Sequence, residues 1–481
     1  YGGAKTQDWG INFHRIIARR NELSFWAPLD RQHNLFRVSE AGTLKNVTVP
    51  KQRNLKLTPY LLGESRTGGA VNANAEREGD WGLDAKYLLT PSLSLDLTYN
   101  TDFAQVEADD VQVNLDRFSI FLPEKRPFFL ENAGQFSVGN PKEVELFFSR
   151  RIGIGSGGVQ QPIAAGARLS GKVRDSTNLG LIHMQTQSVN ALPANSYTVA
   201  RVNQELANRS SLGVIYVARQ GEEDDDYNNT YAVDGRWGIG DEITITGYVA
   251  QTETPRKRGD DYAGSLRFNW DSKSWTNRLG YAKVGENFNP EVGFLRRANY
   301  EKFDVMIFNR TRPSDLWGLF ELRPHAYHRS YFDNDGYHES GFTHIDNHFE
   351  WHNGLEIHTG INFTHEGVRE PFEINKGTYV PIGEYDHKES QLVFMTDRKK
   401  ALFGSVKSFI GGFYGGDRVA VETKLNYRLG DAFTAALTWS HNDIKLPAFA
   451  ATENTPASAG DFEVNVVRLR LGYSFSPKIL L

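Results

Sequence analysis

Hydrophobic and polar residues alternate along many segments of this chain, each about ten residues long. The segments 93–100, 262–271, 418–429 and 467–476 show the alternation most clearly. In the last of them one face carries Val467, Leu469, Leu471, Tyr473 and Phe475, and the other carries Arg468, Arg470, Ser474 and Ser476. A period of two residues is that of a β-strand, and each run is about as long as a tilted strand that crosses a membrane. The pattern predicts an all-β protein.

The lengths of the connections separate a membrane barrel from a soluble β-sandwich or propeller, whose strands also alternate. Short turns recur near Pro91, Asp175, Asn208, Gly240, Ser272, Pro313, Asn353, Lys399 and Gly430. Longer polar connections, such as 221–229 and 445–461, lie between them. An up-and-down barrel with short periplasmic turns and longer outer loops has this arrangement. We therefore predict a transmembrane, up-and-down antiparallel β-barrel, closed around a polar lumen, in the outer membrane of a Gram-negative bacterium.

Tryptophan positions and composition agree with this interpretation. The residues Trp237, Trp270, Trp275, Trp317 and Trp351 all lie near the short turns, where an aromatic belt on the periplasmic side is expected. The chain has 481 residues, of which 23% are charged, and no apolar run reaches the roughly 18 residues of a membrane helix. Its net charge of −5 argues against a nucleic-acid partner. The expected surroundings are outer-membrane lipid and lipopolysaccharide.

The barrel is predicted over residues 51–481, and residues 1–50 lie before it. Two strands per short turn give about 18 strands, and 461–475 adds one more, so we expect about 20. An unpaired strand would leave an open edge in lipid. The odd count therefore predicts either that C-terminal strands are missing from this sequence or that the segment 144–152 supplies the partner. Residues 102–142 are too long for a simple connection and are predicted to be an inserted plug or constriction.

The inserted region contains Asp102-Phe-Ala-Gln-Val-Glu-Ala-Asp-Asp110, then Leu122-Pro-Glu-Lys-Arg-Pro-Phe-Phe-Leu-Glu-Asn132, then Phe148-Ser-Arg-Arg-Ile-Gly153. With Val292-Gly-Phe-Leu-Arg-Arg297, these stretches resemble the DUF5916 family of bacterial outer-membrane barrel proteins, which has no known function. Leu122 stands where an aromatic residue is common in that family. The resemblance implies an upstream β-sandwich similar to a family-9 carbohydrate-binding module. The segment from Trp9 to Arg20 is similar to its end, so residues 1–50 are expected to be the end of a periplasmic domain and a linker.

The sequence 123–127 is a charged segment held stiff by a proline at each end. It places Glu124, Lys125 and Arg126 together, ahead of an apolar anchor formed by residues 128–130. One interpretation is a preformed charged constriction that selects or gates a solute. The other is a structural plug whose charges pair internally, with Glu124 or Glu131 bonded to Arg150 or Arg151.

Two groups of residues could bind a metal ion, although no cofactor is required by the sequence. Asp102, Glu107, Asp109 and Asp110 are oxygen ligands of the type Ca²⁺ prefers, but their spacing is not that of an EF-hand, and solvated loop charge is the favoured explanation. His344, Asp346, His348 and His358 fall on the polar faces of two successive strands, with Glu350, His352 and Glu356. Imidazoles and carboxylates are a transition-metal set, and a hydrated lumen wall is the alternative.

Three functions remain open on this reading. The first is a barrel that passes or binds a solute, for which a glycan-derived molecule is one candidate. The second is an outer-membrane hydrolase acting on lipid or glycan, which is less favoured because the Gly-x-Ser-x-Gly motif is absent and no catalytic triad stands out. The third is a scaffold or translocation partner of a surface lipoprotein or surface assembly, for which a lipoprotein or a periplasmic protein is the expected partner.

Overall fold

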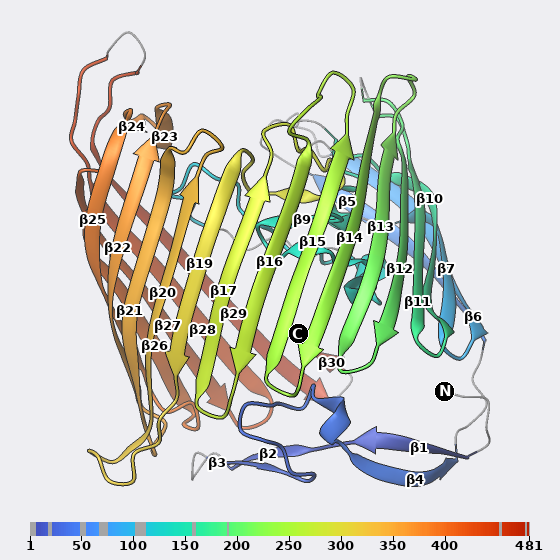
Figure 1. Cartoon of the computed structure of the whole chain (residues 1–481), viewed down its shortest axis with the longest axis horizontal. Helices are drawn as coiled ribbons and strands as arrows, with labels where there is room; N and C mark the ends of the chain where they lie inside the picture. Colours follow the sequence, from blue (N-terminus) through green and yellow to red (C-terminus); the bar gives the residue numbers. More distant parts are fainter. Residues whose placement is uncertain are drawn as a thin grey trace.

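The fold is dominated by one large antiparallel sheet that curves around a central space (Figure 1). The computed structural model describes residues 6–17, 22–48, 54–66, 76–101, 112–155, 160–189, 192–451, 455–476 and 479–480. Among these residues no helix is long and apolar enough to cross a bilayer. The all-β prediction is confirmed.

The sheet contains 20 long strands, and each is antiparallel to its neighbour in the sheet. In order, they begin with β5 (Leu55–Arg66), β6 (Glu76–Thr90), β7 (Leu93–Thr101), β10 (Ile163–Arg174), β11 (Thr177–Thr186), β12 (Ser196–Leu206), β13 (Ser210–Gln220), β14 (Tyr227–Ile239), β15 (Ile243–Glu253) and β16 (Tyr262–Asp271). They continue with β17 (Trp275–Val284), β19 (Tyr300–Asn309), β20 (Leu319–Phe332), β21 (His338–Trp351), β22 (Glu356–Val368), β25 (Gly383–Met395), β26 (Leu402–Phe413), β27 (Gly416–Leu429), β28 (Phe433–Lys445) and β29 (Asp461–Ser476).

The 20 long strands confirm the expected number of about 20 but correct the odd count that the turns gave. The strand that sequence analysis did not count is β5, which pairs with β6 from Leu55↔Tyr87 to Arg66↔Glu76. The segment 144–152 does not supply it. Instead β9 (Val144–Glu145) lies between β8 (Gly139–Asn140) and β18 (Phe294–Leu295) in a separate three-stranded sheet.

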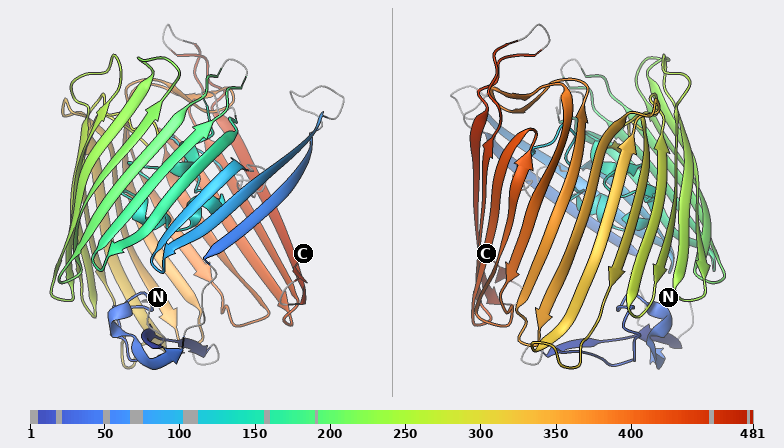
Figure 2. Two further views of the ribbon diagram at one scale, coloured as in Figure 1. Left: turned by 90° about the vertical axis from the view of Figure 1, so that its right-hand side faces the viewer. Right: turned by 60° about the vertical axis from the view of Figure 1, so that its left-hand side comes forward.

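The expectation of a closed barrel is also corrected. In the part of the chain that the structure describes, no ladder of paired residues joins β29 to β5, and the two edges are apart in Figure 2. The strand order joins them only through β30 (Ile479–Leu480), which is the neighbour of both β29 and β5 and pairs with β29 through Ser474 and Ser476. A two-residue strand is too short to cover the length of either edge, so the sheet stays open along most of this seam.

The two faces of the sheet differ as the alternation predicts. On β7 the side chains of Ser94, Asp96 and Thr98 are buried toward the inside, whereas Leu97 and Tyr99 are 45% and 53% exposed on the outside. Large exposed apolar side chains lie on the outer face of every long strand except β20, as in Leu181, Val202, Val214, Tyr231, Val249, Leu266, Leu279, Phe303, Ile345, Ile361, Leu392, Val406, Val419, Leu437 and Leu469. The outer face is therefore an apolar surface without a protein partner among the described residues.

Residues 112–155, called the inserted segment below, lie within the curve of the sheet (Figures 1 and 2). The segment contains one helical turn, α1 (Pro127–Leu130), two 3-10 turns, η3 (Ala133–Phe136) and η4 (Ser149–Arg151), and strands β8 and β9. Its buried apolar side chains form one core with inward-facing residues of β10–β20. The members from the inserted segment are Phe129, Phe136, Val138, Val144, Leu146 and Ile152.

The N-terminal residues form two small sheets at the edge of the barrel that carries the short turns (Figure 1). Strand β1 (Thr6–Ile11) pairs with β4 (Gly42–Thr48), and β2 (His14–Ile17) pairs with β3 (Glu22–Phe25). Ion pairs connect this N-terminal region to the turns: Arg37 lies 2.7 Å from Asp241, and Asp30 lies 3.8 Å from Lys273. Its origin as the end of a sandwich domain stays a prediction. At the opposite edge, β23 (Phe372–Asn375) and β24 (Thr378–Val380) form a hairpin between β22 and β25.

Candidate functional site

The proline-flanked charges of the inserted segment bond to one another. Glu124 accepts hydrogen bonds from the backbone N–H groups of Lys125 and Arg126, at 3.0 and 2.9 Å, and from Ser149 Oγ at 2.7 Å. The Arg126 guanidinium binds both carboxylate oxygens of Glu124, through Nε at 2.9 Å and Nη2 at 2.6 Å. Burial raises the pKa of Glu124, but the hydrogen bonds and charge of Arg126 outweigh it and hold that pKa below its usual value.

Arg126 also holds the end of the inserted segment. Its guanidinium donates to the carbonyls of Ile152 and Ser149, at 2.8 and 2.6 Å, and lies 4.3 Å from the ring centre of Phe129. Only 4% of Arg126 is exposed. A guanidinium so fully bonded is a structural clamp, which favours the internally paired plug over a free charged constriction.

The internal pairs differ from those that the sequence suggested. Neither Glu124 nor Glu131 pairs with Arg150 or Arg151; Glu131 instead contacts Lys86 and lies 3.6 Å from Arg168. Arg150 and Arg151 donate to the carbonyls of Pro123 and Gly293, at 3.0 and 3.2 Å. Every residue has a backbone carbonyl, so the sequence does not indicate which carbonyls accept these hydrogen bonds. The apolar anchor is also smaller than expected, because Leu130 is 51% exposed.

The acidic candidates Asp102, Glu107, Asp109 and Asp110 lie outside the described residues. Their proposed Ca²⁺ site therefore stays a prediction. Lys125 is half-buried beside Glu124.

A second stretch of sequence, 292–297, holds the inserted segment from the other side. Strand β18 pairs with β9 through Phe294↔Glu145 and Leu295↔Val144. The rings of Phe121, Phe148 and Phe294 contact one another, with centres 5.1, 5.1 and 5.9 Å apart. Arg297 lies 3.6 Å from the ring centre of Phe118 and 3.1 Å from Glu339 on β21. Residues far apart in sequence thus meet in one packed unit.

Buried ion pairs fix this unit to the barrel wall. Lys302 on β19 lies 2.6 Å from Glu143, which also accepts a hydrogen bond from Tyr331 on β20. Arg117 lies 2.8 Å from Glu366 on β22. On the opposite side of the inserted segment, Arg168 on β10 bonds Asp96 at 3.0 Å and donates to the carbonyl of Glu131. The inserted segment is therefore anchored on two walls.

The strands from β21 to β29 border a cavity of about 800 Å³ that the inserted segment does not fill. One side of it is formed by Gln112, Val113 and Leu115 of the inserted segment. The wall contributes polar and charged side chains together with two phenylalanine rings: His344, Asn362, Glu389, Gln391, Lys407, Arg418, Glu422, Ser440, Asn442, Arg468, Phe342 and Phe409. Glu389 and Arg418 form a two-bond pair, at 2.8 and 2.7 Å.

The histidine candidates come together on the inner faces of β20, β21 and β22. Asp346 Oδ2 lies 3.4 Å from Nε2 of both His344 and His348. The rings of His348 and His358 stack with centres 3.4 Å apart. Of the other residues on these two faces, Glu350 lies 3.3 Å from Arg323, and His352 packs against Phe320 beside the turn. Spacing alone predicted the meeting of these side chains, because opposite residues of adjacent strands are neighbours.

Sequence comparison identifies the family. The model for "Domain of unknown function (DUF5916)" matches residues 51–179 and 164–481. The chain belongs to the DUF5916 family. No curated protein is significantly similar to it in sequence.

Three solved structures with a similar shape are distant in sequence from this DUF5916 chain. The siderophore receptor PirA from Acinetobacter baumannii is 10% identical, with a TM-score of 0.43, covering 91% of this chain and 77% of that one. Acinetobacter baumannii OccAB2 is 10% identical, with a TM-score of 0.35, covering 87% and 97%. The P pilus usher PapC translocation pore is 9% identical, with a TM-score of 0.27, covering 88% and 93%. At this distance the likenesses carry nothing about substrate or activity.

Sequence reasoning missed several residues that this DUF5916 chain uses. His325 on β20 joins the histidine cluster, with its ring centre 4.8 Å from that of His348. His325 shares one face of a strand with the charged residues Glu321 and Arg323, and this alternation was the signal that could have found it. Lys302 and Arg168 gave no such signal, because their partners lie in the inserted segment, whose position alternation cannot show.

Proposed function

We propose that this chain is an outer-membrane β-barrel that admits a hydrophilic solute into the part of its lumen bordered by β21–β29. Its outer face supports a membrane location: large exposed apolar side chains lie on every long strand except β20, and Trp237, Trp275 and Trp317 are 61%, 41% and 75% exposed near the short turns. In water such a continuous apolar surface would be unfavourable. In a bilayer this apolar surface contacts lipid chains instead of water, and the tryptophans lie at the membrane interface.

The inserted segment acts, on this proposal, as a fixed plug over one half of the lumen. Its core packs on β10–β20, and the buried pairs Lys302–Glu143 and Arg117–Glu366 hold it there. The other half keeps the polar cavity. The observation that carries the proposal is this division of the lumen into a packed half and a half with an open, charge-lined cavity.

The chemistry of the cavity wall favours a polyhydroxylated solute, such as one derived from a glycan. Asn362, Gln391 and Ser440 offer donors and acceptors, while Phe342 and Phe409 offer flat apolar faces. A few placed polar groups beside aromatic rings are the usual composition of a small-molecule site. Fixed charges of both signs, including the Glu389–Arg418 pair, would orient such a solute.

Reconstitution in planar bilayers tests the proposal. We expect ion conductance, or uptake of small sugars in a liposome-swelling assay, and a shift of ion selectivity toward cations in Lys407→Glu, whose side chain lines the cavity. The matched control is Lys388→Glu, since Lys388 is exposed on the outward-facing side of β25 and lies over Phe363. A barrel that conducts no ion, passes no sugar and binds none in solution would contradict the proposal, as would equal effects of the two substitutions.

A further inference from the structure

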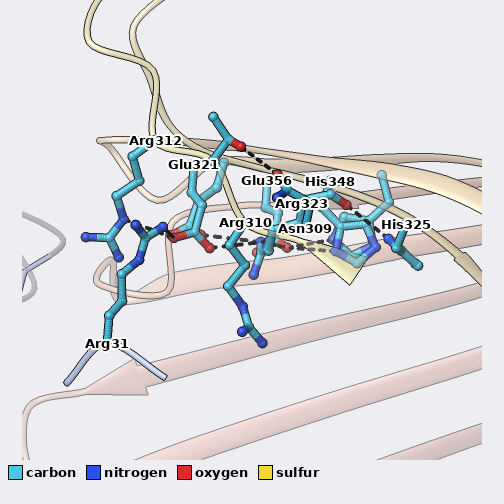
Figure 3. A network of polar contacts seen from close by, with 12 residues as sticks. Arg31, Asn309, Arg310, Arg312, Glu321, Arg323, His325, His348 and Glu356 are labelled. Atoms are coloured by element: carbon cyan, nitrogen blue, oxygen red, sulfur yellow. Dashed lines mark hydrogen bonds and ion pairs between the residues drawn. The ribbon is translucent and has the colours of Figure 1, made fainter. Parts of the chain in front are cut away.

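The inner faces of β20, β21 and β22 carry a cluster of imidazoles and carboxylates near the short-turn edge (Figure 3). Within it, the ligand atoms of His325, Asp346 and His348 lie within 4.8 Å of one another. The ladder explains this closeness, because His325 is directly opposite Asp346 in the pairing of β20 with β21. His348 is two residues from Asp346 and therefore projects from the same face.

His325 is oriented as a metal ligand would be. Its Nδ1 lies 3.0 Å from the carbonyl oxygen of Arg323. A carbonyl can only accept, so Nδ1 carries the proton and Nε2 presents its lone pair. A backbone carbonyl that fixes the tautomer in this way is a usual outer-shell partner of a metal-binding histidine.

Asp346 has an oxygen to spare. Its side chain is fully buried, at 0% exposure. Oδ2 is approached by His344 and His348, and by the Gln391 amide at 3.4 Å, but Oδ1 is buried with no hydrogen-bond partner among the described residues. A buried carboxylate oxygen without a partner is costly, and a bound cation would satisfy it.

A second group, formed by His348, Glu356 and His358, also has its ligand atoms within 4.8 Å. Glu356, however, is already neutralised by Arg323 and lies 2.7 Å from His358 Nε2. A cation there would have to displace the guanidinium. The group that contains Asp346 is therefore the better site. A Cβ at Gly360 would lie only 3.2 Å from Asp346 Oδ2, so the glycine lets the carboxylate take its position opposite β22.

We propose that His325, Asp346 and His348 bind one divalent first-row transition-metal ion, such as Zn²⁺. Two imidazole nitrogens and one carboxylate oxygen suit this class of ion and disfavour Ca²⁺ and Mg²⁺, which take oxygen ligands. Three protein ligands leave coordination positions open for water or for a group of a solute. His344, which contacts Asp346, also lines the 800 Å³ cavity, so the open positions are next to it.

The site is connected to the N-terminal region through one chain of polar contacts (Figure 3). Arg323, whose carbonyl orients His325, has its guanidinium on Glu356 and 3.9 Å from Glu321. Glu321 in turn accepts a hydrogen bond from the guanidinium of Arg31 at 3.1 Å. The proposed ligands are therefore linked to the N-terminal residues indirectly, through Arg323 and Glu321.

Titration of the purified full chain with Zn²⁺ tests the proposal. After treatment with a chelator, calorimetry should show one ion bound per chain. Alanine at His325 or His348, and Asp346→Asn, should each weaken the apparent affinity by at least about tenfold. The control is His183→Ala, which removes an exposed histidine of β11 bonded to Thr198 and should leave the affinity unchanged.

X-ray absorption of the Zn²⁺-loaded wild-type chain keeps the test independent of whether the variants fold. We expect two imidazole ligands and one carboxylate in the first coordination shell. Binding of no ion would overturn the proposal. The proposal would also be overturned if Glu356→Gln lost Zn²⁺ binding while Asp346→Asn kept it, because the ion would then occupy the second group. The result does not depend on whether the barrel conducts.

Discussion

The ammonium of Lys302 on β19 lies 2.6 Å from Oε1 of Glu143 in the inserted segment, and only 4% of the lysine side chain is exposed. This pair is a buried contact between the wall and the segment within it. Replacing one partner leaves the other charge buried without compensation, which costs about 3–5 kcal/mol. We therefore expect Lys302→Met to release residues 139–152 from the wall, seen as faster amide hydrogen exchange in that range.

Two variants make the Lys302 experiment decisive. The double variant Lys302→Met with Glu143→Gln should recover much of the protection, because the charge of Glu143 is then gone as well. Asp304, which lies 3.4 Å from Lys302, keeps Arg267 at 3.9 Å. Lys283→Met breaks a pair of the same length, 2.6 Å to Glu301, whose side chains are each 32% exposed, and should cost no more than about 1 kcal/mol. Unchanged exchange in Lys302→Met would show that the pair does not hold the segment.

The docking of the inserted segment should depend on pH. Burial raises the pKa of Glu143, but the charge and hydrogen bond of Lys302 outweigh it, so that this pKa, like that of Glu124, lies below its usual value. A carboxyl whose pKa is lowered on folding stabilises the fold above its unfolded pKa of about 4.3, and the stabilisation is lost as the pH falls through the folded pKa.

We therefore expect the inserted segment to be equally protected at pH 7 and pH 6 and to lose protection only in the acid range below about pH 4.3. The rate of protease cleavage within the inserted segment after brief exposure to acid measures this loss of protection. The variant Glu143→Gln should show a smaller acid effect, since one of the two carboxyls is gone. Loss of protection already near pH 6 would point to histidine instead.

Arg126→Lys should loosen the end of the inserted segment although the charge is kept. A lysine ammonium cannot reach both oxygens of Glu124 and the carbonyls of Ile152 and Ser149 at once, as the guanidinium does. Leaving such buried acceptors without a donor costs about 1–3 kcal/mol each. Limited proteolysis between residues 124 and 152 should become faster.

Arg296→Lys is the matched control for Arg126. Arg296 lies 2.9 Å from Asp116, but its side chain is 40% exposed. Water can therefore supply the hydrogen bonds that a lysine at this position would not make. Equal proteolysis of both variants would contradict the clamp assigned to Arg126.

The edges of β5 and β29 should pair when the protein is in a bilayer. Unpaired backbone N–H and C=O groups facing lipid each cost several kcal/mol. The chain has no cysteine, so single cysteines can be placed without background. We expect a cysteine at Leu57, which is 57% exposed, to form a crosslink with one at Val467, Leu469, Leu471 or Tyr473, the outward positions of β29.

A set of outward positions on β20 supplies the control, because β20 lies on another part of the sheet and should give no crosslink with Leu57. If no position on β29 crosslinks in vesicles of outer-membrane lipid, the seam is open in the membrane as well. A lateral opening would then have to be part of how the barrel works.

The sequence by itself determined the strands, their faces and the even spacing of turns, because a period of two residues is a local property of the chain. It also brought His344, Asp346, His348 and His358 near one another, since cross-strand neighbours follow from register. It missed β5, whose run Leu55–Arg66 contains Pro59 and two adjacent leucines and so alternates poorly.

Only the tertiary structure decided how the lumen is used. That Glu143 meets Lys302, that Arg126 bonds the carbonyls of Ile152 and Ser149, and that β9 pairs with β18 depend on where an irregular segment lies inside the sheet. An irregular segment has no period, and its partners are chosen by shape and by the need of each buried polar group for a partner. For that reason the strands could be predicted from the sequence, whereas the division of the lumen into a packed half and a half with an open polar cavity could not.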